Sequence, residues 1–434
     1  MSNIDLVLQH LKKRNVFLTG GAGVGKSYTT NEIIKYYRSQ SDEQIVALGS
    51  TGVSAVNIGG FTVHSFFVFG ISNNFEELKQ HDKGSRSRIR ELKKILKVTD
   101  LIVIDEISMV SSNMMEMISY RLDALGYLGK LLFVGDFFQL PPISKYKKKS
   151  ETLFDNRLYA FESDAWISFN PVIIELREMK RTTDAEFTHI LHKVRLGECD
   201  EEVVDYMLNL ANTKIVNPNP TFLFGRNIEV DDSNREKLNS VDSKEYFLYA
   251  SIVKHGGKIH EKRLASWKKM LPIEEDLILK IGVPVLFTVN KWGRYVNGER
   301  GIVRAIEDDY IVVEKEDDYV RVERYNFDLL EMKSDENGKI SSAKLATLSQ
   351  FPLKLAYAVT IHKSQGMSID NFVCNLDNIF APSQFYVAIS RAINPNNLRL
   401  DFNRGDLKTH LQKILNVDQR VINYYKELEE PSLE

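Results

Sequence analysis

A glycine-rich turn between a short apolar run and a helical pattern constrains the fold of this 434-residue chain more than any other feature. Residues 16–27 read VFLTGGAGVGKS, in which residues 20–27 fit the pattern G-x-x-x-x-G-K-[ST]. Residues 16–18 predict a buried strand, and Ile33 and Tyr37 lie on one side of the helix predicted to follow. In this context, backbone N–H groups surround phosphates at a helix N-terminus. The segment therefore predicts a site for a nucleoside triphosphate.

The side chains of this turn suit the phosphates and their metal ion. Lys26 is expected to reach the β and γ phosphates, and the hydroxyl of Ser27 is expected to bind Mg²⁺. The predicted nucleotide-binding residues of this segment are Gly21, Ala22, Gly23, Val24, Gly25, Lys26, Ser27 and Tyr28.

Two further apolar runs end in polar groups that suit phosphate hydrolysis. LIVIDE (101–106) ends in two carboxylates, of which Asp105 can hold Mg²⁺ through water and Glu106 can polarise an attacking water. LLFV (131–134) runs into GDFFQLPP, where Gln139 could sense the γ phosphate or the water. Taken alone, these groups could be an ordinary strand end and a surface loop. The phosphate loop upstream favours a nucleotide hydrolase.

Short apolar strands alternate with helical patterns in this part of the chain. Such alternation predicts an α/β fold with a parallel sheet covered by helices on both faces. Because ligands bind at the carboxyl ends of strands in such sheets, the polar groups described above are expected to meet at one edge. The predicted strands are 16–18, 45–48, 101–104, 131–134 and 172–176.

Composition narrows the classes of protein to which the chain can belong. Hydrophobic residues make up 43% and charged residues 27%, as in soluble globular proteins. The sequence has no signal-peptide pattern and no apolar run of the roughly 20 residues that span a bilayer, so we expect a cytoplasmic or nucleoid location. With only Cys199 and Cys374, a disulfide framework and a four-cysteine zinc site are excluded. Because the net charge is −2, any nucleic-acid binding must come from local grooves.

A series of motifs beyond the phosphate loop occurs in one order and resembles the motifs of superfamily 1 DNA helicases, in their 5′-to-3′ branch. The likeness is greatest to the PIF (petite integration frequency) family, with RecD-type helicases second, and runs from about residue 14 to 400. The motifs are GSTGVSAVNIGGFTVHSFF (49–67), DEISM (105–109), GDFFQLPP (135–142), REMKRTTDAEF (177–187), TIHKSQGMSID (360–370) and QFYVAISRA (384–392).

The resemblance implies an ATP-hydrolysing motor that uses Mg²⁺. Arg181 and Arg391 match two arginines that reach the ATP phosphates from a second motor domain, where they would neutralise charge during phosphoryl transfer. Gln365 and Gly366 would approach the ATP side. The implied catalytic residues are Lys26, Glu106, Gln139, Arg181 and Arg391, and the implied metal ligands are Ser27 and Asp105.

The resemblance also implies that the motor grips single-stranded DNA and unwinds duplex DNA, forks or quadruplexes. Such a grip depends on phosphate contacts and base stacking, which tolerate any sequence. We expect a monomer, with other DNA-repair or replication proteins as partners. The implied DNA-binding residues are Thr51 and His64 in the first motor domain, and Thr360, His362, Lys363 and Ser364 between the domains.

Two departures from the family pattern affect these expectations. The family has a glutamine that contacts adenine ahead of the first strand, whereas the matching position here falls near Asn3, so preference for ATP over other nucleotides is not predicted. The chain also lacks the long terminal extensions of eukaryotic members, which indicates a bacterial or phage-like motor core.

The expected architecture is two RecA-like P-loop motor domains with a small SH3-like β-barrel inserted in the second. Strands at 221–225 and 284–288 are expected in the second motor sheet, and a hairpin turn at Asn297-Gly298 opens the insertion. The expected domains are 1–170 with a small insertion around 66–95, then 171–291 together with 349–425, the barrel at 292–348, and a tail at 426–434.

The function expected from these features is an ATP-dependent 5′-to-3′ DNA helicase. A P-loop phosphotransferase is an alternative, but it explains only residues 1–140 and leaves Arg181 and the later motifs without a role. A nucleotide-gated DNA-binding module without unwinding is another alternative. The presence of Glu106 argues against it, because a switch that only binds can lose the carboxylate that activates water.

Overall fold

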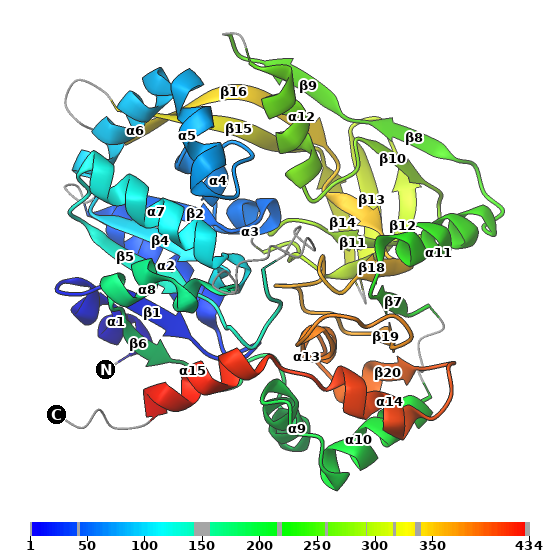
Figure 1. Cartoon of the computed structure of the whole chain (residues 1–434). Coiled ribbons are helices and arrows are strands. Elements are labelled where there is room, and N and C mark those ends of the chain that lie inside the picture. Colours follow the sequence, from blue (N-terminus) through cyan, green and yellow to red (C-terminus); the bar gives the residue numbers. More distant parts are fainter. Residues whose placement is uncertain are drawn as a thin grey trace.

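The chain folds around two parallel sheets, with antiparallel strands beside the second (Figure 1). We call the part built on the first parallel sheet the first lobe and the part built on the second parallel sheet the second lobe. The computed structural model describes residues 2–40, 44–142, 157–214, 219–256, 259–291, 293–315, 318–334 and 340–429.

The sheet of the first lobe has six parallel strands in the order β3-β2-β4-β5-β1-β6. All five strands predicted for this region are present in it, and each polar motif follows the carboxyl end of its strand. The strands are β1 (Val16–Thr19), β2 (Ile45–Gly49), β3 (Phe61–Thr62), β4 (Leu101–Asp105), β5 (Lys130–Val134) and β6 (Val172–Glu175).

Helices cover both faces of this sheet, as the alternating pattern predicts. Two helices pack on one face, where Leu11 and Ile33 share a core with Val103. On the other face, Ile118 and Trp166 pack with Phe17. The helices of this lobe are α1 (Asn3–Leu11), α2 (Lys26–Ser39), α3 (Gly52–Asn57), α4 (Val63–Phe66), α5 (Phe75–Gly84), α6 (Arg86–Val98), α7 (Ser112–Leu125) and α8 (Asp164–Phe169).

The sheet of the second lobe has four parallel strands in the order β18-β7-β19-β20. These strands are β7 (Thr221–Phe224), β18 (Ala358–Thr360), β19 (Phe372–Asn375) and β20 (Leu398–Asp401). The helices of the lobe are α9 (Ala185–Arg195), α10 (Glu201–Asn212), α11 (Asn227–Asn239), α13 (Gln384–Ile389) and α14 (Leu407–Ile414).

The strand predicted at 284–288 requires a correction. It forms β11 (Pro284–Phe287), which pairs with antiparallel strands and not with β7. Since β11 is apolar and buried along its whole length, its composition does not distinguish a parallel from an antiparallel partner. The antiparallel region thus includes strands that precede and follow the predicted barrel at 292–348 in the sequence. The domain limits themselves remain a prediction.

Three antiparallel sheets make up this region, in the orders β14-β13-β12-β11-β17, β15-β16-β9 and β10-β8. The hairpin β15–β16 extends to α6 of the first lobe (Figure 1). The other elements are β8 (Tyr246–Tyr249), β9 (Ser251–Lys254), α12 (Glu261–Met270), β10 (Asp276–Leu279), β12 (Arg300–Ile306), β13 (Tyr310–Lys315), β14 (Asp318–Glu323), β15 (Tyr325–Ser334), β16 (Ile340–Gln350) and β17 (Leu353–Leu355).

The chain returns to the first lobe through α15 (Gln419–Glu429). Leu411 and Ile414 of α14 belong to the core of the second lobe, whereas Val421 of α15 belongs to the core of the first. Helix α15, drawn in red, lies between β6 and α9 (Figure 1). The predicted tail at 426–434 therefore begins inside this helix, and residues 430–434 lie outside the described residues. In the described part of the chain, no helix is both long and apolar enough to cross a membrane.

A buried ion pair joins the two lobes beside α15. Arg195, at the end of α9, donates from Nε and Nη2 to the two oxygens of Asp136, at 3.1 and 3.0 Å. Asp136 follows β5 and is fully buried. Because Asp136 is out of water, its charge depends on Arg195 for compensation, whereas Arg195 also lies 3.6 Å from Glu175.

We expect Arg195→Ala to lower the free energy of unfolding by about 3–5 kcal/mol, because Asp136 would be left buried and unpaired. The measurement is denaturant unfolding of the nucleotide-free protein. Arg177→Ala is the matched control, since Arg177 pairs with Glu175 while its side chain is 81% exposed, and such pairs contribute little. Similar losses in the two variants would contradict the importance of the buried pair.

Candidate functional site

The phosphate loop has a backbone that only glycine adopts easily. Gly20, Gly23 and Gly25 have φ angles of 136°, 84° and 92°. A Cβ at Gly20 would lie 2.3 Å from the carbonyl oxygen of Leu176, and one at Gly23 would lie 2.7 Å from the Cβ of Arg181. Neighbouring protein atoms occupy these positions, so glycine allows the loop to pack closely against residues 176–181.

Lys26 lies where the phosphate-loop motif predicts it, at the start of α2. Its Nζ donates to the carbonyl oxygens of Gly20 and Gly21, at 2.6 and 2.9 Å. Burial lowers the pKa of this ammonium, so the site favours an added negative charge beside it. Ser27 and Tyr28 are exposed at the mouth of the loop, Tyr28 at 65%.

Tyr386 of α13 holds the same loop from the second lobe. Its hydroxyl accepts the backbone N–H of Ala22 at 2.8 Å. The side chain of Val24 packs into the core under the sheet, so it supports the loop and does not face a ligand. Neither contact is signalled by the loop motif, because both depend on the packing of the whole fold.

Asp105 and Glu106 lie together after β4. The backbone N–H of Glu106 donates to Oδ1 of Asp105 at 2.9 Å. Glu106 has φ 55° and ψ 51°, a left-handed conformation that is unfavourable for a residue with a side chain. Burial raises the pKa of both carboxyls, and the charge of Glu106 raises that of Asp105 further. A cation between the phosphates and these carboxylates would relieve both effects.

Gln365 joins the second lobe to Glu106 and Gln139, two predicted catalytic residues of the first. Its Nε2 donates to Oε2 of Glu106 at 3.0 Å and to Oε1 of Gln139 at 3.3 Å. Its own Oε1 is buried without a hydrogen-bond partner among the described residues. The amide therefore has one acceptor available for a ligand or water in the cleft.

Arg181 and Arg391 lie close together on the second-lobe side. Nε of Arg181 donates to Ser368 Oγ at 3.0 Å, and Nη1 donates to the carbonyl oxygen of Ser390. Arg391 donates to the carbonyl oxygen of Met367 at 3.2 Å, which ties it to the 360–370 motif. Burial lowers the pKa of Arg181 to about 9, and the neighbouring charge of Arg391 adds to this effect. Burial also lowers the pKa of Arg391 to about 10, although the charges of Tyr386 and Glu106 oppose the shift.

These groups converge on a cavity of about 290 Å³ between the lobes. Lys180 and Ser368 also line the cavity but were not predicted, although both stand in the motifs quoted above. Gly21, Val24, Asp105 and Gln365 are predicted residues that do not line it. The predicted residues that line the cavity are Ala22, Gly23, Gly25, Lys26, Ser27, Tyr28, Glu106, Gln139, Arg181, Gly366 and Arg391.

The cavity fits a nucleoside triphosphate with its metal ion. Lys26, Arg181 and Arg391 supply positive charge on both walls, and Ala22, Gly23 and Gly25 of the phosphate loop line the cavity. Among the described residues, no group of three or more His, Cys, Asp or Glu side chains could hold a metal ion. Ser27 and Asp105, the predicted metal ligands, would be a sparse donor set of the kind that suits Mg²⁺, which keeps several waters and takes other ligands from phosphates.

The loop predicted to bind DNA contains residues of two kinds. Lys363 is exposed, and His362 stacks on the ring of Phe380 at 6.2 Å. Thr360 and Ser364 are buried, and their hydroxyls bond within the loop, Thr360 accepting from the N–H of Lys363 at 3.2 Å. The hydroxyls are thus engaged in shaping the loop, and their direct contact with DNA remains a prediction.

Two side chains near this loop were missed by the motifs. Lys354 lies close enough to Lys363 that burial and this second ammonium lower its pKa to about 8. Phe380 is 61% exposed beside His362. A pair of adjacent ammonium groups and an exposed ring suit a phosphate backbone and a stacked base. The only signal in the sequence was the placement of each residue near a motif.

The DNA-side residues of the first lobe lie at the ends of short helices. Thr51 Oγ1 accepts the N–H of Ser54 at 3.1 Å and caps α3. His64, on α4, faces the ring of Phe69 edge-on at 6.1 Å. Both belong to the segment after β2, on the side of the sheet where its strands end.

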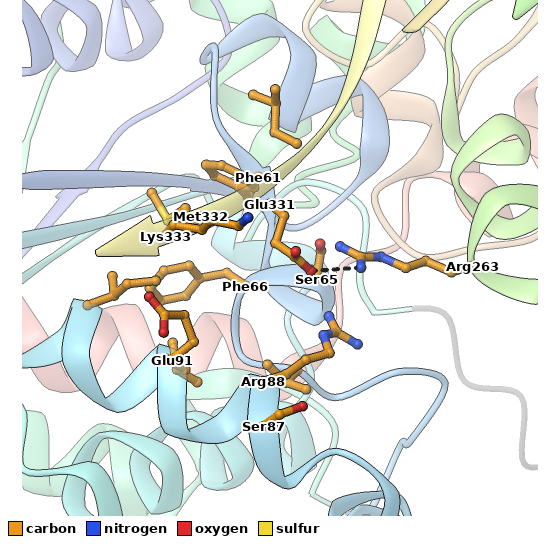
Figure 2. A pocket seen from close by; sticks show the side chains of 14 residues that line it. Phe61, Ser65, Phe66, Ser87, Arg88, Glu91, Arg263, Glu331, Met332 and Lys333 are labelled. Atoms are coloured by element: carbon orange, nitrogen blue, oxygen red, sulfur yellow. Dashed lines mark hydrogen bonds and ion pairs between the residues drawn. The ribbon is translucent and has the colours of Figure 1, made fainter. Parts of the chain in front are cut away.

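A larger cavity of about 390 Å³ lies elsewhere, between α6 and β15. In Figure 2, Arg263 and Glu331 point toward each other, and their ion pair measures 3.1 Å. Arg88 of α6 faces the same space. None of the predicted nucleotide-binding residues lines this cavity, so the smaller cavity is the candidate nucleotide site.

A phosphate loop after β1, paired carboxylates after β4 in the same sheet and arginines on the second-lobe side define a two-lobed P-loop nucleotide hydrolase. A family model described as PIF1-like helicase matches residues 2–205, and another described as Helicase matches residues 303–427. The ATP-dependent DNA helicase Pif1 of Campylobacter jejuni is 42% identical over 425 residues, which cover 95% of this chain and 94% of that protein. The chain belongs to the Pif1 family of helicases, as the ordered motifs predicted.

Solved structures agree with this membership. Pif1 of Bacteroides sp. in complex with ADP-AlF4 matches with a TM-score of 0.81 at 26% identity, covering 99% of this chain and 97% of that one. Bacteroides Pif1 bound to single-stranded DNA matches with a TM-score of 0.66 at 26% identity, covering 98% and 96%. The expected fold of two RecA-like domains with an antiparallel insertion is confirmed by these likenesses.

We expect Lys26→Ala to abolish the rise in melting temperature that Mg²⁺ and a non-hydrolysable ATP analogue produce in the wild-type protein. The reason is that Lys26 supplies the charge at the centre of the phosphate loop while contributing little to the core. Melting without nucleotide is the control and should change little. An undiminished nucleotide effect in the variant would show that the nucleotide binds elsewhere.

Proposed function

We propose that this chain is an ATP-dependent DNA helicase that moves 5′ to 3′ on single-stranded DNA and separates duplex or forked DNA. The observation that carries the proposal is the loop at 360–367 (TIHKSQGM). Gln365 in this loop donates to Glu106 and Gln139, whereas Lys363, two residues earlier, is exposed. One loop therefore touches the catalytic carboxylate and also presents a cation to solvent. This gives DNA a physical route to the rate of hydrolysis.

In the proposed reaction, binding and chemistry fall to different residues. The loop N–H groups and Lys26 bind the β and γ phosphates, while Ser27 and Asp105 would hold Mg²⁺. When bound, Mg²⁺ neutralises developing charge on the phosphates. Glu106 polarises the attacking water, and Gln139 orients it.

The second lobe supplies charge that the first lobe lacks. Arg181 and Arg391 place two guanidiniums against the γ phosphate, where they stabilise the charge that develops as the phosphoryl group leaves. Closing of the lobes on ATP and opening after hydrolysis would advance the grip on the strand by one step. This cycle accounts for catalytic groups that stand on both sides of one cleft.

The proposed DNA grip is independent of sequence. Lys363 and Lys354 face phosphates, and Phe380 offers a ring on which a base can stack. The pKa of His362 is lowered by burial, so its ring acts as a neutral donor at physiological pH. Thr51 and His64 would contact the strand from the first lobe. The DNA-bound Bacteroides relative supports single-stranded DNA as the track.

The wider setting of the activity is part of the same proposal. A DNA motor of this family is expected to work as a monomer in the bacterial cytoplasm, on the nucleoid, alongside repair or replication proteins. The alternatives are a phosphotransferase, which would need no DNA, and a nucleotide-gated module, which would bind DNA without unwinding it. Family membership and the link from Gln365 to Glu106 favour the helicase.

Strand displacement distinguishes these alternatives. With equal duplexes carrying either a 5′ or a 3′ single-stranded tail, we expect unwinding of the 5′-tailed substrate only, and only with ATP and Mg²⁺. Glu106→Gln is the control, because it retains nucleotide binding but should unwind neither substrate. Unwinding of the 3′-tailed substrate alone would contradict the direction, and DNA-independent phosphate transfer to a small acceptor would favour the phosphotransferase.

Two substitutions in the loop should separate DNA binding from coupling. Lys363→Ala should weaken binding of single-stranded DNA and reduce the dependence of log K on log salt by about 0.7, the value for one phosphate contact. Gln365→Ala should keep DNA affinity near wild type but lose most DNA stimulation of ATP turnover, because the contact from the loop to Glu106 and Gln139 is removed. Fluorescence anisotropy over a salt series and ATPase assays with and without oligo-dT measure both. If both variants behave alike, the loop does not divide its contacts in this way.

A further inference from the structure

The helix α15 contributes to the nucleotide site although no helicase motif falls on it. We propose that Tyr425 of α15 is a positioning residue for ATP hydrolysis, because its hydroxyl ties the strand end before the phosphate loop to the loop that carries Gln139. The inference rests on the proposed ATPase function and adds a residue to its machinery. Tyr425 lies outside every motif that carries the family resemblance.

The contacts of the hydroxyl join two segments that must keep their spacing. Tyr425 OH lies 2.9 Å from Thr19 Oγ1, and Thr19 is the residue directly before Gly20 of the phosphate loop. The backbone N–H of Phe137 donates to the same hydroxyl at 3.4 Å. Because that N–H can only donate, the hydroxyl proton remains available for Thr19. A single oxygen thus lies between the ends of β1 and β5.

Phe137 stands two residues before Gln139 in the loop after β5. The carbonyl oxygen of Asp136 accepts the N–H of Gln139 at 2.9 Å, so the loop turns tightly at this point. A shift of Phe137 is therefore transmitted to Gln139 over one short turn. The side-chain amide nitrogen of Gln365 donates to both Gln139 and Glu106.

The ring of Tyr425 extends this support to the second lobe. The Tyr425 ring stacks on that of Phe138, with ring centroids 4.7 Å apart. The guanidinium of Arg195, on α9, lies 4.7 Å from the centroid of the Phe138 ring. The same guanidinium is 5.7 Å from the Tyr425 ring and pairs with Asp136. Side chains from α15, the β5 loop and α9 thus form one stack.

The path of α15 makes this stack sensitive to the position of the lobes. The segment before the helix is attached to the second lobe, where the N–H of Ser383 donates to the carbonyl oxygen of Asn416 at 2.8 Å. Five residues later, Val421 is fixed in the core of the first lobe. Relative movement of the lobes must therefore act on α15, and Tyr425 passes that movement to the nucleotide loops.

The adjacent tyrosine provides a matched control on the same helix. Tyr424 is also buried among aromatic rings, with its centroid 4.3 Å from that of Phe161. Its hydroxyl accepts the indole N–H of Trp166 at 3.2 Å, and Trp166 belongs to α8, outside both nucleotide loops. Tyr424→Phe and Tyr425→Phe therefore each remove one buried hydroxyl, but only the latter removes a contact with those loops.

The test compares these two variants with the wild-type protein in steady-state ATPase assays with saturating oligo-dT. We expect Tyr425→Phe to lower kcat about three- to tenfold, the effect of one buried hydrogen bond, while KM for ATP changes less than twofold. Tyr424→Phe should keep kcat within about twofold of wild type. Thermal melting is recorded in parallel and should change similarly in the two variants, since each loses one buried hydroxyl contact.

A double-mutant cycle identifies the partner of the hydroxyl. Thr19→Val should reduce kcat by itself. Adding Thr19→Val to Tyr425→Phe should lower kcat little further than Tyr425→Phe alone, because the contact with Thr19 is already lost in that variant. A wild-type kcat in Tyr425→Phe, or an equal loss of kcat in Tyr424→Phe, would overturn the positioning role. Failure of the wild-type protein to hydrolyse ATP would instead overturn the proposed function.

Discussion

The buried pair of Asp136 and Arg195 is the interaction on which the arrangement of the cleft depends. Asp136 lies two residues after the end of strand β5, and Arg195 ends the first helix of the second lobe. The pair holds the loop bearing Gln139 against α9 and orders the aromatic stack on which α15 rests. Removing Arg195 would leave the charge of Asp136 buried without its ion-pair partner, so the junction is strongly held in one geometry.

Around this junction, the cleft contains charges that the protein alone does not balance. Burial lowers the pKa of Lys26 and of both arginines, and it raises the pKa of Asp105 and Glu106. Phosphates would compensate the cations, and Mg²⁺ would compensate the carboxylates. The electrostatic strain of the protein is therefore matched to the ligand pair that the family uses, and the left-handed backbone of Glu106 adds local strain at the same place.

The sequence predicted the parts of the molecule that follow from local pattern. Short apolar runs bounded by polar motifs marked all five predicted strands of the first sheet, since parallel strands buried on both faces are apolar throughout. The same reasoning misplaced the strand at 284–288, because an apolar run carries no information about the direction of its partner. The roles of Ser364 and Thr360 show a similar limit: a hydroxyl in a polar motif can face either solvent or its own loop, and burial distinguishes these cases.

The sequence by itself determined the phosphate loop, the carboxylates after β4 and the order of motifs that places the chain among Pif1-type helicases. These features depend on residue type and short spacing, which are written directly in the chain. Only the tertiary structure decided that Gln365 meets Glu106 and that Arg195 pairs with Asp136. Only the tertiary structure, likewise, decided that Tyr425 bridges two loops. Those contacts join residues 59 to 406 positions apart, and such separations are bridged only when the sheets pack and the chain crosses between the lobes.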